Sequence, residues 1–154
     1  CLVVGLAGWL WVFGLGVAAF GLGSVATSAP LLGVVAAAVG SYTLVAVSIG
    51  FLMGQIGLGQ HAANAVANIG GMALSFLGGA WVPIEWLPDS LARAARLTPG
   101  YWADRAISGA YEATSMSAAV LGPLLVDCGI CALFAVAVFS VAVAVGRARA
   151  RSAL

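Results

Sequence analysis

Four long apolar runs, none of which contains a lysine or an arginine, constrain this chain more than any other feature of its sequence. They cover about residues 1–23, 31–54, 61–82 and 123–145. Each could cross the hydrocarbon core of a bilayer as a helix, which takes about 20 residues. Lipid offers the backbone no hydrogen-bond partners, so such runs must form helices or closed barrels, and these runs lack the alternation of barrel strands. We therefore expect an all-α membrane protein with four transmembrane helices.

The composition agrees with a membrane protein. Of the 154 residues, 63% are hydrophobic and 7% are charged, whereas a soluble domain carries roughly 25% charged residues. So few charges cannot cover a surface that faces water. The net charge of +1 predicts no nucleic-acid partner, because such proteins carry a basic patch. We expect residues 1–154 to form a single transmembrane domain and, since the chain begins at Cys1 inside an apolar run, to be part of a longer protein.

The basic residues at the end of the chain predict its orientation. Arg147, Arg149 and Arg151 directly follow the fourth apolar run. Lys and Arg close to the end of a span stay in the cytoplasm. The sequence therefore predicts a multi-pass protein of the cell membrane with a cytoplasmic C-terminus, and it places segment 83–122 outside.

This outer segment is expected to hold two short interfacial helices. Pro83 and Pro88 should interrupt any continuing helix. Asp89 suits the start of a short helix that Pro99 stops, and a second helix can run over about 101–111. The segment and its flank also carry aromatic residues of the kinds that gather at the membrane–water boundary, namely Trp81, Trp86, Tyr101, Trp102 and Tyr111. From these residues alone, an anchored interfacial loop and a gate or re-entrant element remain open alternatives.

The same segment resembles the ABC-2 type permeases. In that family a span ends in Gly-Gly-x-x-x-Pro, followed by x-x-x-Leu-Pro, a short helix and a Thr-Pro-x-Tyr/Trp step. The matching residues here are Gly79, Pro83, Leu87, Pro88, Leu91, Pro99, Tyr101 and Trp102. The final apolar run with its short basic tail also fits. The resemblance extends over essentially the whole chain, as the C-terminal four of the family's usual six spans.

The resemblance implies an exporter subunit rather than an enzyme. Permeases of this family pair as dimers, expected here to be homodimers, and work with separate ATP-binding cassette subunits in the cytoplasm. ATP would bind to those partners, so the permease itself would hold no cofactor. Pro83, Pro88 and Pro99 would shape an outer gate. The family's main ATPase contacts lie near its N-terminus and between its second and third spans, and neither region is present in this sequence.

One face of the third apolar run is polar. The spacing of its polar residues puts them on one side of a helix, and the residues are His61, Asn64, Asn68 and Ser75. Polar side chains in membrane helices usually turn toward another helix or a water-filled path. This face is a candidate lining of the substrate path or of the dimer contact, and ordinary hydrogen bonding between helices is the alternative.

The fourth apolar run contains the only acid within a predicted span. Asp127 is expected near the outer end, where it can reach headgroups and the positive end of the helix dipole. A role in proton coupling is the sharper alternative. Cys128 and Cys131 form a C-x-x-C pattern but, inside an apolar span, are expected to be small packing residues. No metal site is expected, since His61 and the cysteines fall at opposite ends of their spans.

Two other functions remain open beside the exporter. The chain could be a membrane assembly subunit that moves nothing. It could also be a small proton-coupled secondary transporter, for which Asp127 and His61 would be the coupling residues. Such transporters usually show polar breaks at paired positions near mid-membrane, and the sequence does not show them.

Overall fold

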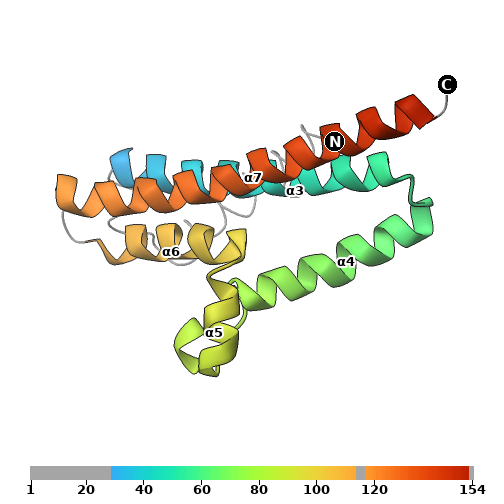
Figure 1. The fold of residues 1–154 in the computed structure, drawn as a ribbon. Helices are drawn as coiled ribbons and strands as arrows, with labels where there is room; N and C mark the ends of the chain where they lie inside the picture. The colour runs from blue at the N-terminus through green and yellow to red at the C-terminus, as the bar shows by residue number, and fades with distance from the viewer. Residues whose placement is uncertain (1–28, 114–116, 153–154) are drawn as a thin grey trace.

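The computed structural model describes residues 29–113 and 117–152, and within these ranges the chain is helical without strands. The elements are α3 (Ala29–Ile56), α4 (Gln60–Leu77), the 3-10 turn η1 (Ile84–Trp86), α5 (Asp89–Ala95), α6 (Pro99–Glu112) and α7 (Ala118–Ser152) (Figure 1). The first predicted span, 1–23, lies outside the described residues.

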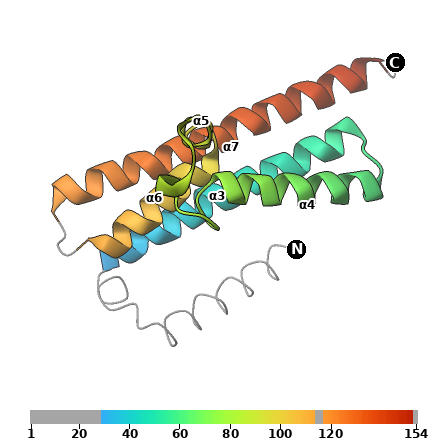
Figure 2. The same ribbon diagram turned by 90° about the horizontal axis from the view of Figure 1, so that it is seen from below.

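The core of the fold is the pair formed by α3 and α7, which run side by side in the same direction (Figures 1 and 2). Near one end the Cys128 thiol lies 3.7 Å from the backbone oxygen of Val34. Toward the other end the rings of Phe51 and Phe139 stack with centroids 5.4 Å apart. Because the residue numbers of the contacting pairs rise together, the two helices are parallel.

Helix α6 packs against both members of this pair and runs in the opposite direction. Its alanines are buried: Ala103 packs with Val45 and Cys131, whereas Ala110 packs in the cluster that contains Leu31. Small side chains allow helices to approach closely without a large apolar filling. The result is a three-helix bundle of α3, α6 and α7.

Helix α4 returns from the end of α3 but diverges from the bundle (Figures 1 and 2). None of its side chains, all of which the structure describes, is buried. Its end meets the start of α6, since a Cβ atom added at Gly78 would lie 3.0 Å from Gly100 Cα. With 18 and 14 residues, α4 and α6 would measure about 27 and 21 Å. End to end they would measure about 48 Å, somewhat more than the roughly 42 Å of the 28-residue α3, so together they are long enough to form an interrupted return path.

The prediction of four transmembrane helices is wrong. Among the described residues two helices are long and apolar enough to cross a membrane, Ala29–Ile56 and Ala118–Arg151. They contain the predicted spans 31–54 and 123–145, and Pro123 lies inside the second helix. The third predicted span, 61–82, does not qualify, because α4 ends at Leu77 and carries too many polar residues for its 18-residue length.

The expectation of two interfacial helices is also corrected. Helix α5 begins at Asp89, as predicted, and is short. The second helix, α6, begins at Pro99 rather than at Tyr101, and it packs between other helices, because its Ala103, Ala106 and Ala110 are buried in the bundle. The small apolar residues of α6 recur on one face, which suits close packing against other helices. The aromatic residues at its start therefore do not decide where the helix lies.

We expect the junction between α4 and α6 to be sensitive to a single methyl group. In Gly78→Ala the new Cβ would lie 3.0 Å from both Gly100 Cα and the Leu74 carbonyl oxygen. These are backbone atoms that cannot rotate away, so the variant should lose about 1–3 kcal/mol of stability. Thermal unfolding in detergent measures the loss. The control is Gly70→Ala, where nothing lies within 4 Å. Equal stability of the two variants would contradict the close junction.

Candidate functional site

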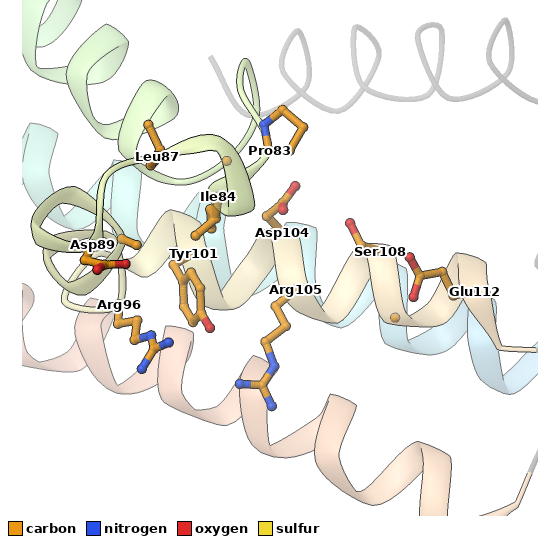
Figure 3. A pocket seen from close by; sticks show the side chains of 13 residues that line it. Pro83, Ile84, Leu87, Asp89, Arg96, Tyr101, Asp104, Arg105, Ser108 and Glu112 are labelled. Carbon is orange, nitrogen blue, oxygen red and sulfur yellow. The ribbon is translucent and has the colours of Figure 1, made fainter.

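A polar cavity of about 680 Å³ lies beside α6, on the side that faces η1 and α5 (Figure 3). We call it the α6 cavity. One wall comes from α6 and the other from the segment between α4 and α6. The lining residues are Gly79, Pro83, Ile84, Leu87, Asp89, Ala92, Arg96, Tyr101, Asp104, Arg105, Ser108, Gly109 and Glu112.

The α6 wall follows from the two faces of this helix. Thr98 caps its N-terminus, with a side-chain oxygen that accepts a hydrogen bond from the Tyr101 backbone N–H at 3.4 Å. From this start, Asp104, Ser108 and Glu112 recur at the four-residue spacing that keeps side chains on one face. The alanine face packs into the bundle, so the polar face is left to line the cavity (Figure 3).

The opposite wall is set by a glycine turn at the end of α4. The N–H of Ala80 donates to the Ser75 carbonyl, and the N–H of Gly79 donates to the Phe76 carbonyl. These two bonds form a Schellman motif, which requires a left-handed residue such as Gly79 with its φ of +94°. A Cβ at Gly79 would lie 3.1 Å from Asp104 Oδ2, so the turn lies directly against α6.

Behind the cavity, Arg105 contacts a buried carboxylate. Its Nε lies 3.1 Å from Asp127 Oδ2, and Asp127 is 2% exposed while the Arg105 side chain is half exposed. Oδ2 accepts no hydrogen bond from the described residues, so the contact is ionic without hydrogen-bond alignment. The Arg105 guanidinium also lies 5.5 Å from the centroid of the Trp102 ring. Asp127 therefore lies inside the bundle, where its carboxylate is buried against Arg105.

The residues that carry the family resemblance gather around this cavity. Those that line it are Gly79, Pro83, Leu87 and Tyr101. Pro88 directly precedes α5 and Pro99 begins α6. Trp102 Nε1 donates to the Arg96 carbonyl at 2.9 Å, which ties the end of the intervening segment to α6.

Sequence reasoning missed the charged part of the cavity. It singled out neither Asp104, Ser108 and Glu112 nor the contact of Arg105 with Asp127. The available signal was the four-residue polar spacing within an otherwise apolar chain. The partner of Asp127 was harder to find, because α6 was expected at the interface rather than in the bundle.

The predicted polar face of α4 lies elsewhere. His61, Asn64 and Asn68 are exposed and Ser75 is half-buried. They line neither the α6 cavity nor a smaller, apolar cavity of about 270 Å³ between α3 and α4. The α4 residues of that smaller cavity lie on a different face and are Val66, Ala67, Gly70, Gly71 and Leu74.

The cysteines pack as expected. Cys128 and Cys131 are buried thiols that are not joined in a disulfide, and each belongs to a core cluster with α3. Within the described ranges, no three His, Cys, Asp or Glu residues lie close enough to hold a metal ion.

In comparisons with protein families, with curated proteins and with solved structures, nothing matches this chain.

We expect the two partners of the ion pair to differ in their effect on stability. Arg105→Gln leaves Asp127 buried without a counter-charge and should cost about 3 kcal/mol, as for other broken buried pairs. Asp127→Asn removes the buried charge itself and leaves Arg105, which is half exposed, to be solvated. Asp127→Asn should therefore lose much less stability than Arg105→Gln. Thermal unfolding of both variants in detergent tests the asymmetry, and the reverse order would refute it.

Proposed function

We propose that this chain is a membrane-spanning permease subunit of an ABC exporter, which moves substrate with energy from ATP hydrolysed by a separate subunit. One observation carries the proposal: between two parallel apolar helices, the return path is broken beside a charged cavity. A pair of parallel spans with an interrupted third element suits a protein that opens a path through the bilayer. The resemblance of segment 79–102 to the ABC-2 permeases gives the particular class.

The exposed surface of α3 and α7 supports insertion in a membrane. Only 33% of the α3 residues and 22% of the α7 residues in their most apolar stretches are buried. A core helix of a soluble protein would be mostly buried, since exposed apolar patches are normally small. Large apolar side chains such as Leu44, Ile56, Leu133 and Val136 point outward instead. Lipid is the environment that suits such a surface.

The direction of the helices supports a topology. Two spans that cross in the same direction require the chain to come back between them, and α4 followed by α6 is the available route. The basic end of α7 would lie in the cytoplasm, so its N-terminal end would lie outside. The α6 cavity would then lie toward the outer side, and α4 would extend from the cytoplasmic side to the interruption.

The interruption supports transport in particular. Ala103 packs with Val45, which lies near the middle of α3, so with α3 across a bilayer the break would fall at the depth of the hydrocarbon core. Irregular backbone at that depth is tolerated only where protein covers it or where it lines a water-filled space. Several transporters bind their substrates between half-helices of this kind. In this proposal Pro83, Pro88 and Pro99 shape an outer gate.

The surface of α4 supports a second permease subunit as partner. Ile69 and Met72 are about 70% exposed on a helix without buried residues. The polar residues His61, Asn64 and Asn68 are exposed on the same helix. In a homodimer, α4 would face the second copy, and its polar face would line the path or the dimer contact. The ATP-binding cassette subunits would meet the cytoplasmic ends of both copies.

Proton coupling through Asp127 and His61 has less support. His61 lies at the start of α4, beside the C-terminal end of α3, whereas Asp127 lies near the N-terminal end of α7. Since α3 and α7 are parallel, these are opposite ends of the bundle. Asp127 is also paired with Arg105. The other alternative, a membrane assembly subunit, would not move substrate, so a transport assay distinguishes it from the permease.

The decisive experiment is co-purification of the full-length protein with the ATP-binding subunit encoded nearest to its gene. We expect a stable complex with vanadate-sensitive ATP hydrolysis in lipid nanodiscs, and transport in vesicles. The ATP-binding subunit alone and empty nanodiscs are the controls. A complex that hydrolyses ATP without any transport would favour an assembly role. Absence of a complex with every encoded candidate would overturn the proposal.

A second measurement tests the α4 face. Replacement of Asn64 and Asn68 by alanine should change the range of transported substrates or weaken dimerisation, because both amides lie on the surface assigned to the path or the dimer. The control is Val66→Ala, on the face toward α3. Substrate range and dimer mass are measured by vesicle uptake and by light scattering. If both stay at wild-type values in the double variant, the face has neither role.

A further inference from the structure

We propose that the apolar cavity between α3 and α4 holds an acyl chain of a phospholipid whose anionic head group contacts the arginines at the end of α7. We call this space the α3–α4 cavity. The inference goes beyond the proposed transport, because the lipid belongs to the folded protein whether or not a substrate is moved. It rests on the part of that proposal that places α3 and α7 across a bilayer.

The α3–α4 cavity exists because α4 is fixed at its two ends and diverges from the bundle between them (Figures 1 and 2). A short turn joins it to α3 at one end, and it meets the start of α6 at the other. Gly50 on α3 and Gly70 and Gly71 on α4 line the cavity, and a Cβ added at any of them would meet nothing within 4 Å. The resulting space of about 270 Å³ is apolar apart from the Tyr42 hydroxyl, and no charged residue of the described chain lines it.

The length and the depth of the cavity match one leaflet of a bilayer. Its lining on α3 runs from Tyr42, at the middle of this helix, to Met53, near the turn into α4. This stretch of helix rises about 16 Å, whereas the whole hydrocarbon core is about 30 Å thick. The end near mid-membrane is lined by Leu74 and Pro99, at the break between α4 and α6. If a methylene group takes roughly the 30 Å³ of a water molecule, the cavity can hold about nine carbon atoms of an acyl chain.

The other end of the cavity lies close to cations. A Cβ added at Gly57, in the turn between α3 and α4, would lie 2.5 Å from Arg149 Nη1. The Arg149 guanidinium therefore lies about one helical turn beyond Met53, which lines the cavity. Arg147 and Arg151 flank it on α7 and are exposed. A guanidinium carries five N–H donors in a fork that suits phosphate, so Arg149 can contact a head group in addition to its contacts within the protein.

The acids of the chain lie far from these arginines. Four of the five fall in segment 85–112, which follows α4. The fifth, Asp127, precedes Arg147 on α7 by about 30 Å of helix. Basic pockets between membrane helices on the cytoplasmic side bind anionic head groups. An apolar cavity of leaflet length that ends beside a basic cluster therefore fits an anionic phospholipid of the inner leaflet.

The test measures lipid binding to the delipidated full-length protein in non-ionic detergent by native mass spectrometry. The probe is dioleoyl phosphatidylglycerol, and the comparison is dioleoyl phosphatidylcholine, which has the same acyl chains and a zwitterionic head group. We expect one phosphatidylglycerol per chain, with an affinity about tenfold or more above that of phosphatidylcholine, since each nearby arginine favours an anionic head group. Equal affinity for the two lipids, or retention of neither, would overturn the proposal.

A substitution that fills the cavity tests where the lipid lies. Gly70→Leu places a side chain where nothing lies within 4 Å, so it should fold and should weaken phosphatidylglycerol binding severalfold through lost packing of the acyl chain. Gly50→Leu, from the opposite wall, should do the same. The control is Gly40→Leu, at an exposed and equally open position of α3 outside the cavity.

Thermal unfolding in detergent verifies that these variants fold. Wild-type lipid binding in both cavity variants would mean that charge alone holds the lipid, and would refute the site. A loss of dimer mass in light scattering, with lipid binding unchanged, would assign the cavity to a second copy of the chain and would refute the site as well.

Two arginines provide a matched pair for the head group. Arg149→Gln should weaken phosphatidylglycerol binding about fivefold, the contribution of one basic residue near an anionic surface, and should leave phosphatidylcholine binding unchanged. Arg93→Gln removes the same charge from the exposed surface of α5 and should change neither. Losses of equal size in both variants would point to net charge and would contradict a head-group site at the end of α7.

The result is separable from that of the proposed function. Lipid binding in detergent needs neither ATP nor the ATP-binding subunit. Phosphatidylglycerol binding without a complex would leave the lipid site standing and remove the exporter, whereas a functional complex without preference for phosphatidylglycerol would do the reverse.

Discussion

The parallel pairing of α3 and α7 is the constraint on which the rest of the structure depends. Two helices that point the same way cannot be joined by a short turn, so about 60 residues between them must return the chain to the starting end. Most of that return is made by α4 and α6 in succession. The groove between the parallel helices is filled by α6, whose alanines allow a close fit. Helix α4 is left outside the bundle, and this position explains why it buries nothing of its own.

The second consequence concerns charge. An apolar chain has few places where ionised groups are tolerable, because their transfer from water is costly. This chain gathers most of the charges outside its basic tail into the return path and the cavity beside it. Arg105 lies between Asp127 inside the bundle and the cavity outside it. The polar face of α6 thus keeps its charged side chains away from the apolar helices α3 and α7.

The sequence allowed the prediction of the elements that depend on length and composition. Residues 31–54 were expected to be helical, and the helix is Ala29–Ile56. Pro88 allowed the start of α5 at Asp89 to be predicted, because proline interrupts a preceding helix and is tolerated at the start of the next one. The failures have two causes. Helix α4 is too short and too polar to qualify as a span, because it ends at Leu77. The burial of α6 in the bundle depends on which helices it meets. The contact of Arg105 with Asp127 joins residues 22 positions apart, because α6 packs against α7. The local sequence pattern of either helix does not predict this contact.

The break between α4 and α6 would be costly at membrane depth if its backbone groups had no partners, because an unsatisfied amide or carbonyl in hydrocarbon costs several kcal/mol. Local bonds limit this cost. The Schellman turn at Gly79 satisfies carbonyls at the end of α4, while Thr98 accepts the Tyr101 N–H at the start of α6. Glycines at the junction let the two ends touch. The intervening segment can therefore leave the bundle and return without opening either helix, and the cavity is the space between that excursion and α6.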